Sequence, residues 1–405
     1  MQRANAHVRR IATFATWASM LVALVTLAQP LLGSQPAQAQ ESSSSDLAKR
    51  IARYRKDLAA YEKARAAYDR VADPYWRRVT QTRTQRRSKL ARGQRVTLND
   101  YVLEQPPPYT GPDKPIDPEA HKKPRPIPTS VEFLKHAKTH FGFVPEMPRK
   151  EWDYKLAYAR AASAAGLGKR TCVKIYGFES GGNGTYDIQA GREYSRKARV
   201  ISTALGYNQL LTTNSVELVA EQGDKIMKML RRQAQAAAGG RKDALEQKMQ
   251  ILAKMIRFTR TVPDTWSAHV RLGETERGIG VHALVLDVDI GPLLQTEKLL
   301  TSVVFARRKG FRDELTAAEL EMMNLTGDGN GYDMLQMSET MRRKVPTSNF
   351  FQRRGYERNP VAIRHNTVAK LLAITNNRMD ANSNLPGAKE LAAAFGSATA
   401  SNEVR

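Results

Sequence analysis

Residues 172–182 read CVKIYGFESGG, and residues 204–210 read ALGYNQL. The first stretch is apolar and predicts a helix that ends at Glu179-Ser180, because the two glycines that follow leave a helix readily. A carboxyl at the buried end of a helix is poorly hydrated when ionised, so we expect the pKa of Glu179 to be raised. Such a carboxyl stays protonated near neutral pH and can act as a general acid.

The two stretches together resemble the lysozyme-like soluble lytic transglycosylases. That family has a helix ending in Glu-Ser, then a loop, then Gly-x-x-Gln before another helix, and here these positions are Glu179-Ser180 and Gly206-Tyr207-Asn208-Gln209. The resemblance covers residues 172–211 of 405. The family's later Ala-Tyr-Asn-Ala-Gly motif is not recognised, so no residue is assigned to the far wall of a cleft.

The resemblance implies a mainly α fold and a lyase that cleaves the MurNAc-GlcNAc bond of peptidoglycan. In the family, one carboxyl protonates the glycosidic oxygen and then takes the proton of the muramic C6 hydroxyl, which closes on C1 as a 1,6-anhydro end. Glu179 would be this sole acid and base. The substrate-binding residues implied or expected are Ser180, Gly206, Tyr207, Asn208, Gln209 and Asp187. Asp187 lies in a Gly-rich loop, where it either positions sugar or water or caps its own turn.

The start of the chain predicts export. Three arginines, at positions 3, 9 and 10, precede an uncharged apolar run from Ile11 to Leu32, and Ala37-Gln38-Ala39 is a small-x-small cleavage site. This pattern is typical of a cleaved signal peptide at 1–39 and indicates a periplasmic protein, with an uncleaved membrane anchor as the alternative. The single cysteine, Cys172, cannot form an internal disulfide, so the fold depends on its core.

The formal net charge of +24 predicts an anionic partner. With an export signal, that partner is expected among cell-wall polymers and anionic membranes rather than nucleic acid. Residues 46–95 carry 16 Lys or Arg against 5 Asp or Glu and are expected to contact such surfaces.

An apolar seam with 4-and-3 spacing crosses this basic segment at Leu47, Ile51, Tyr54, Leu58, Tyr61 and Tyr68. It predicts one coiled-coil-like helix that docks on the catalytic domain or self-associates, with a lone helix on a membrane surface as the third alternative. Many prolines follow, and they predict an extended linker. The predicted parts are a signal peptide (1–39), a basic helical segment (40–104), a Pro-rich linker (105–128), a lysozyme-like transglycosylase domain (129–399) and a tail (400–405).

Within the domain the pattern is helical. Helices are predicted at 131–141, 151–167, 169–179, 214–235 and 243–261, the last two forming a hairpin broken at Gly239-Gly240. A strand is plausible only at Val281–Asp289, although a buried helix has the same apolar character. Asp287 and Asp289 would share one face of that strand, so both or neither would line the cleft.

No metal or cofactor is predicted. Residues 327–331 read GDGNG and begin like a calcium loop, but Tyr332 and Asp333 occupy positions that require an oxygen ligand and a glycine. His136 and His140 share a helical face, and no third ligand is evident in the sequence. Two further functions remain open: a catalytically inactive peptidoglycan-binding module, and an envelope scaffold or assembly protein that acts through its basic N-terminal helix.

Overall fold

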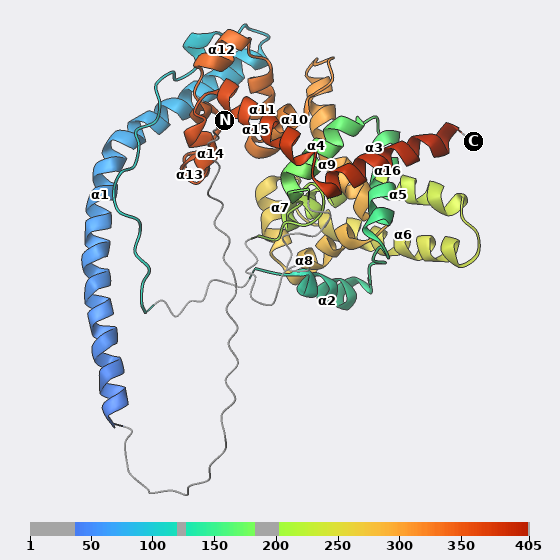
Figure 1. Cartoon of the computed structure of the whole chain (residues 1–405), viewed down its shortest axis with the longest axis horizontal. Coiled ribbons are helices and arrows are strands. Elements are labelled where there is room, and N and C mark those ends of the chain that lie inside the picture. Colours follow the sequence, from blue (N-terminus) through green and yellow to red (C-terminus); the bar gives the residue numbers. More distant parts are fainter. Residues whose placement is uncertain (1–36, 120–126, 183–201, 404–405) are drawn as a thin grey trace, which may run out of the picture. The chain divides into compact units, whose positions relative to one another are not determined.

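The computed structural model describes residues 37–119, 127–182 and 202–403 (Figure 1). These residues are mainly helical, as predicted, and contain no strand. They divide into two compact units. One contains the chain up to Ala59 with Pro115–Glu119, and the other contains Ala60–Lys114 and the described residues from 127 onward. The predicted signal peptide lies outside the described residues up to position 36.

The described residues form α-helices and three short 3-10 helices. In chain order they are α1 (Ala37–Ala91), η1 (Leu98–Asp100), α2 (Ser130–Phe141), α3 (Glu151–Ala164), α4 (Lys169–Ser180), α5 (Thr212–Gln235), α6 (Gly239–Thr259), α7 (Trp266–Gly273), α8 (Glu276–His282), η2 (Ala283–Leu286), α9 (Gly291–Arg308), α10 (Ala317–Thr326), α11 (Asp328–Leu335), α12 (Glu339–Lys344), η3 (Thr347–Phe350), α13 (Arg353–Glu357), α14 (Pro360–Arg364), α15 (Val368–Asn382) and α16 (Pro386–Glu403).

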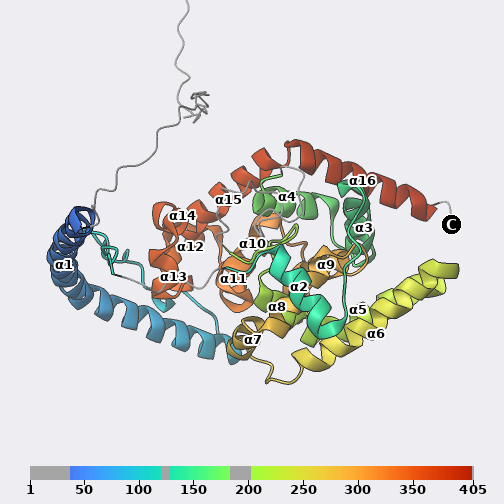
Figure 2. The same cartoon turned by 90° about the horizontal axis from the view of Figure 1, so that it is seen from below.

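The larger core surrounds α4, which packs against α3, α10, α15 and α16. Its apolar side chains, including Cys172, Ile175 and Tyr176, are buried because the helix is enclosed on several sides. The helices α5 and α6 lie side by side as the expected hairpin (Figure 2). They approach closely at Gly223, where a Cβ would stand 2.5 Å from Ile256 Cγ1.

A second core joins the end of α1 to the segment from α11 to α15. Trp76 and Val79 of α1 are buried there, and the Tyr75 hydroxyl lies 2.7 Å from Ser348 Oγ. Two arginines of the same helix are also buried, and Arg83 donates to the carbonyls of Asn349 and Phe351. Residues 60–114 therefore belong to one compact unit with the helical domain. The sequence instead predicts a Pro-rich linker between the basic helical segment and that domain.

The strand suggested at Val281–Asp289 is not formed. The segment contains the end of α8, then η2, then a turn into α9. Nearly all of its side chains are buried, so its apolar residues form a continuous run without the alternation of a half-buried strand. Asp287 accepts hydrogen bonds from the backbone N–H groups of Asp289 and Ile290 and so fixes the turn before α9. Both aspartates also pair with Lys248. They hold the fold and do not line the cavity at Glu179.

Within the described residues, no single helix combines the length and apolar character of a membrane span. A pair formed by Glu276–Leu286 and Gly291–Arg308 meets that test jointly, with a bend of 100° between its halves.

Candidate functional site

Glu179 lies in the last turn of α4, where the sequence predicted it. The helix ends because Gly181 and Gly182 both adopt the left-handed conformation, with φ of 71° and 60°. Gly182 also passes so close to the next layer that a Cβ there would stand 3.0 Å from the carbonyl oxygen of Asn382. These two glycines therefore serve both to end the helix and to allow close packing.

A second carboxyl contacts Glu179. Glu321 of α10 is 6% exposed, and its side chain hydrogen-bonds to that of Glu179. The Asn324 amide, one turn further along α10, donates to Glu179 Oε1 at 3.1 Å. Two carboxyls in direct contact hold a proton between them, because two adjacent buried negative charges repel.

The electrostatics of the pair favour a protonated acid. Burial raises the pKa of Glu321 well above its usual value, and the negative charge of Glu179 raises it further. Burial also raises the pKa of Glu179 to about 7, although hydrogen bonding from Glu321 and the charge of Lys298 act in the opposite direction. The pair thus keeps one proton at neutral pH, and the second proton is gained or lost at Glu179 near pH 7.

The pair faces a small cavity. Its volume is about 10 Å³, roughly the room that one water molecule needs. The lining residues come from α4, α9, α10 and the turn before α5, and are Ile175, Glu179, Asn208, Lys298, Leu299, Ser302, Leu320, Glu321 and Asn324. No sugar ring fits in a cavity of this size, so a saccharide would approach Glu179 from its partly exposed side.

Other carboxyls extend the acidic character of this region. Burial raises the pKa of Glu217 to about 7, with a further contribution from the charge of Glu221. Burial likewise raises the pKa of Asp328, whose carboxylate accepts a hydrogen bond from Ser302 at 2.7 Å. The positive charge of Lys298 acts on Glu217, Asp328 and the carboxyl pair alike.

The Gly-x-x-Gln segment forms a tight turn beside the pair. Leu205 and Leu210 pair across it as an isolated bridge, and Gln209 takes a left-handed φ of 45°. Gly206 has φ 85°, and a Cβ there would stand 1.9 Å from Gln295 Nε2. Gln295 Oε1 accepts from the Asn208 backbone N–H at 2.8 Å, so α9 fixes the turn and brings Asn208 to the cavity.

Four residues expected to bind substrate are buried instead, namely Ser180, Gly206, Tyr207 and Asn208. Tyr207 is fully buried, its ring packs edge-on against Tyr154, Tyr158 and Tyr176, and its hydroxyl donates to Glu151. Ser180 is also fully buried, and its hydroxyl donates to the Tyr176 carbonyl. Tyr207 and Ser180 therefore support the site from within the core.

Of the remaining predicted residues, Gln209 is partly exposed, and its amide donates to the Gly206 carbonyl at 2.8 Å. Asp187 lies outside the described residues. Glu321, Asn324, Lys298 and Ser302 were not predicted. The one available signal was Glu321 itself, a lone carboxylate within the apolar run LEMM at 320–323.

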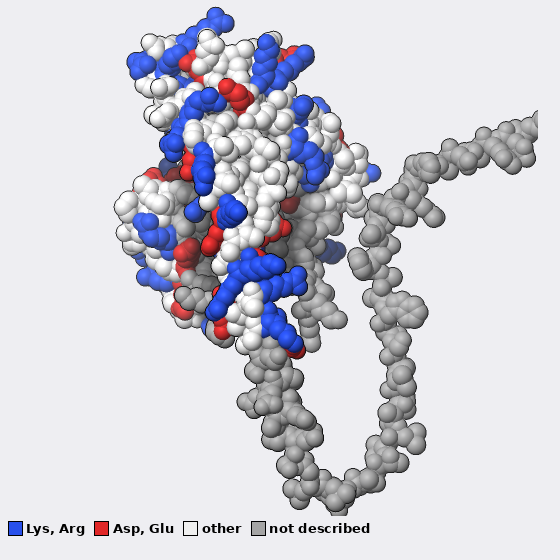
Figure 3. Space-filling view, turned by 90° about the vertical axis from the view of Figure 1, so that its left-hand side faces the viewer, with Lys and Arg blue, Asp and Glu red and all other residues white. Residues whose placement is uncertain are grey.

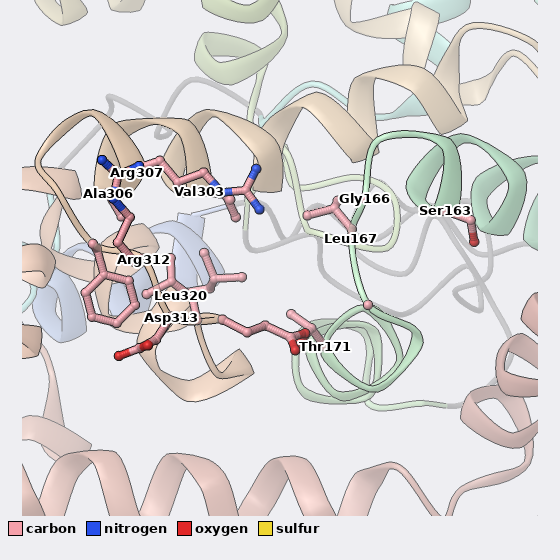
Figure 4. Close-up of a pocket in the computed structure, with 14 residues that line it drawn as sticks. Ser163, Gly166, Leu167, Thr171, Val303, Ala306, Arg307, Arg312, Asp313 and Leu320 are labelled. Carbon is pink, nitrogen blue, oxygen red and sulfur yellow. The ribbon is translucent and has the colours of Figure 1, made fainter.

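A larger cavity of about 560 Å³ lies between the α3–α4 turn and the loop from α9 to α10 (Figure 4). Leu320 lines both this cavity and the small one at Glu179. The wall of the larger cavity includes the side chains of Arg307, Arg312 and Asp313. The volume is in the range of sites for small ligands.

The raised pKa of Glu179 predicts how stability depends on pH. A carboxyl whose pKa is higher in the folded than in the unfolded state binds protons preferentially when folded, so stability falls as pH rises between the two values. For Glu179 that window runs from its ordinary 4.5 to about 7. We expect Glu179→Gln to unfold with a smaller loss of stability across this window than wild type, measured by urea unfolding at pH 4.5 and 7.5. Equal losses in both proteins would show that Glu179 titrates normally.

Comparisons of the whole chain with protein-family models, with characterised proteins and with solved structures give no match. The likeness to lysozyme-like transglycosylases therefore rests on the residues themselves: the carboxyl at the end of α4 and the Gly-x-x-Gln turn.

Proposed function

We propose that this chain is an exported peptidoglycan lytic transglycosylase with a lysozyme-like domain, in which Glu179 is the acid and base. The observation that carries the proposal is the carboxyl pair. A partly exposed carboxyl with a pKa near 7 lies at the end of α4 and shares a cavity with Asn208 of the Gly-x-x-Gln turn. An acid that is half protonated at the working pH is suited both to donating a proton and to taking one back.

The proposed reaction uses one carboxyl twice, first to donate a proton and then to accept another. Protonated Glu179 donates to the glycosidic oxygen as the bond from that oxygen to muramic C1 breaks. The muramic C6 oxygen then bonds to C1, and its proton passes to the Glu179 carboxylate. The enzyme ends in its starting state, no water is consumed, and the product is a 1,6-anhydromuramoyl end.

Glu321 supports this route as a positioning residue. The usual glycosidases place two carboxyls on opposite sides of the bond, about 5 Å apart for retention and further for inversion. Glu179 and Glu321 are in hydrogen-bond contact, so no sugar ring fits between them. Glu321 instead donates to Glu179 and holds it in one orientation, while Lys298 stabilises the ionised form that takes the proton back.

The test is digestion of purified sacculi followed by mass analysis of the soluble products. The proposed reaction gives anhydro ends, each lighter by one water than the hydrolysed counterpart. Reducing ends would identify a hydrolase, and binding without soluble products would identify a peptidoglycan-binding module.

The start of α1 supports a role in surface attachment. Its described part carries five exposed cations at Lys49, Arg50, Arg53, Arg55 and Lys56. The face viewed in Figure 3 carries many Lys and Arg side chains. Two exposed acids, Asp46 and Asp57, lie beside these five cations and leave an excess of positive charge. Such an excess attracts an anionic surface without needing a shaped site.

We expect replacement of these five cations by glutamine to weaken binding to sacculi and to anionic vesicles at low salt. The difference from wild type should shrink as salt rises, because exposed charges are screened over about 8 Å at physiological ionic strength. Co-sedimentation across a salt series measures it. Neutral vesicles are the control, and equal binding by both proteins at low salt would exclude electrostatic attachment through α1.

A further inference from the structure

His136, His140 and Glu276 come together on the surface where α2 packs on α8 (Figures 1 and 2). The ligating atoms of the three side chains all lie within 4.8 Å of one another. Glu276 Oε2 is 3.2 Å from His140 Nε2 and 3.8 Å from His136 Nδ1. The two imidazole rings are stacked, with planes inclined by 12°. Both rings therefore present a nitrogen to the same carboxylate oxygen.

The backbone fixes this arrangement. His136 and His140 are one helical turn apart, so they share a face of α2. Glu276 begins α8, and α8 crosses α2 so closely that a Cβ on Gly280 would stand 2.9 Å from the backbone of His136 and Ala137. The two histidines are therefore held opposite Glu276 by packing of the main chain, rather than by a surface ion pair alone.

The positive charge of Arg277 is directed away from the carboxylate of Glu276. Arg277 follows Glu276 in α8, but its guanidinium lies over the rings of Phe141 and Phe258, 5.5 and 4.5 Å from their centroids. The side chains of His136 and His140 are 12% and 25% exposed, and that of Glu276 is 67% exposed. The cluster is thus preformed by the helices and open to solvent on the carboxylate side.

The geometry points to a binding site for a divalent transition metal of the zinc class, with His136, His140 and Glu276 as ligands. Two imidazole nitrogens and one carboxylate oxygen are a ligand set that Zn²⁺ accepts, and water would complete four-coordination on the open side. Ions such as Mg²⁺ and Ca²⁺ prefer all-oxygen sites. At ligand distances of about 2.0–2.1 Å, atoms 3.2 and 3.8 Å apart can share one ion. The bound metal would clamp α2 to α8.

The test uses the full chain without a histidine tag, stripped with EDTA, and calorimetric titration with Zn²⁺ or Mg²⁺. We expect one Zn²⁺ per chain, no binding of Mg²⁺, and a higher unfolding temperature with Zn²⁺. His136→Gln and His140→Gln should each weaken Zn²⁺ binding by at least about tenfold, since even outer-shell changes cost that much. His365→Gln, a partly buried histidine of another segment, is the matched control and should bind as wild type does.

Absorbance with Co²⁺ gives a second readout that does not depend on stability. The visible bands of protein-bound Co²⁺ should appear with wild type, Glu179→Gln and His365→Gln, and should be lost in the double variant His136→Gln/His140→Gln. Zn²⁺ binding of equal strength and stoichiometry in that double variant would overturn the assignment, as would the absence of Zn²⁺ binding by wild type. Retention of the Co²⁺ bands in Glu179→Gln would show that this site is separate from the proposed catalytic one.

Discussion

Glu179→Gln is expected to lower the release of anhydromuropeptides from sacculi by at least about 10²-fold, the lower end of what a general acid contributes. Glutamine keeps the size of the side chain and can still accept the hydrogen bond that Asn324 donates to Glu179 Oε1. It cannot donate a proton to the leaving oxygen or accept the proton of the C6 hydroxyl. The variant should therefore fold, bind sacculi and fail to cleave them.

Two further variants make this result specific. Glu246→Gln removes an exposed carboxylate of α6 and should leave activity unchanged. Glu321→Gln keeps a group that can donate to Glu179 but removes the second titrating carboxyl. It should shift the pH profile of cleavage while leaving more activity than Glu179→Gln. Full activity in Glu179→Gln would exclude the proposed mechanism, whatever the products are.

Local pattern was enough to predict the elements around Glu179. The apolar run before it and the glycines after it gave α4 and its end, and the spacing of apolar residues gave α2, α3 and the α5–α6 hairpin. Boundaries moved by a few residues. The helix predicted from Asn214 begins at Thr212 instead, so Asn214 lies inside its first turn and accepts from the Leu211 N–H. Shifts of this size are normal at helix ends.

The residues that contact Glu179 could not be predicted from the sequence, because these contacts join segments that are distant in the chain. Glu321 lies on α10 and reaches Glu179 only when α10 packs on α4. Glu276 lies far along the chain from the two histidines that it faces. Tyr207 shows the opposite limit, since a motif residue that looked like a ligand contact is fully buried. Sequence spacing gives the face of a helix, and the tertiary fold decides what that face meets.

The basic N-terminal helix is similarly instructive. Past Trp76 its sequence becomes polar and rich in arginine, a residue that is mostly exposed in folded proteins. Arg86 is nevertheless fully buried, because its guanidinium pairs with Asp333 of α11 and lies 4.3 Å from the Tyr101 ring centroid. Deleting the helix to test a scaffold function would remove the cation that pairs with Asp333 and would uncover the apolar residues of the second core. Point substitutions on the exposed part of α1 are the cleaner test.

Asp333→Leu is expected to destabilise the fold by about 3–5 kcal/mol, the cost of removing one partner of a buried ion pair. The substitution leaves the Arg86 charge buried and unpaired, and it removes the acceptor of the Tyr101 hydroxyl, which donates to Asp333 Oδ1 at 2.9 Å. Arg86→Met should destabilise the fold by a comparable amount, because it leaves the Asp333 carboxylate buried without its cation. Urea unfolding at constant pH measures both effects.

The double variant Arg86→Met/Asp333→Leu discriminates between a charge effect and simple loss of packing. With both charges removed, its destabilisation should be smaller than the sum of the two single effects, because neither partner is left unpaired. Arg87→Met is the matched control, since Arg87 is the next residue of α1 and hydrogen-bonds to Asn330 of the same helix α11, but at the exposed surface. Its effect should stay within about 0.5 kcal/mol. Additive losses in the double variant would mean that the charges of Arg86 and Asp333 do not couple.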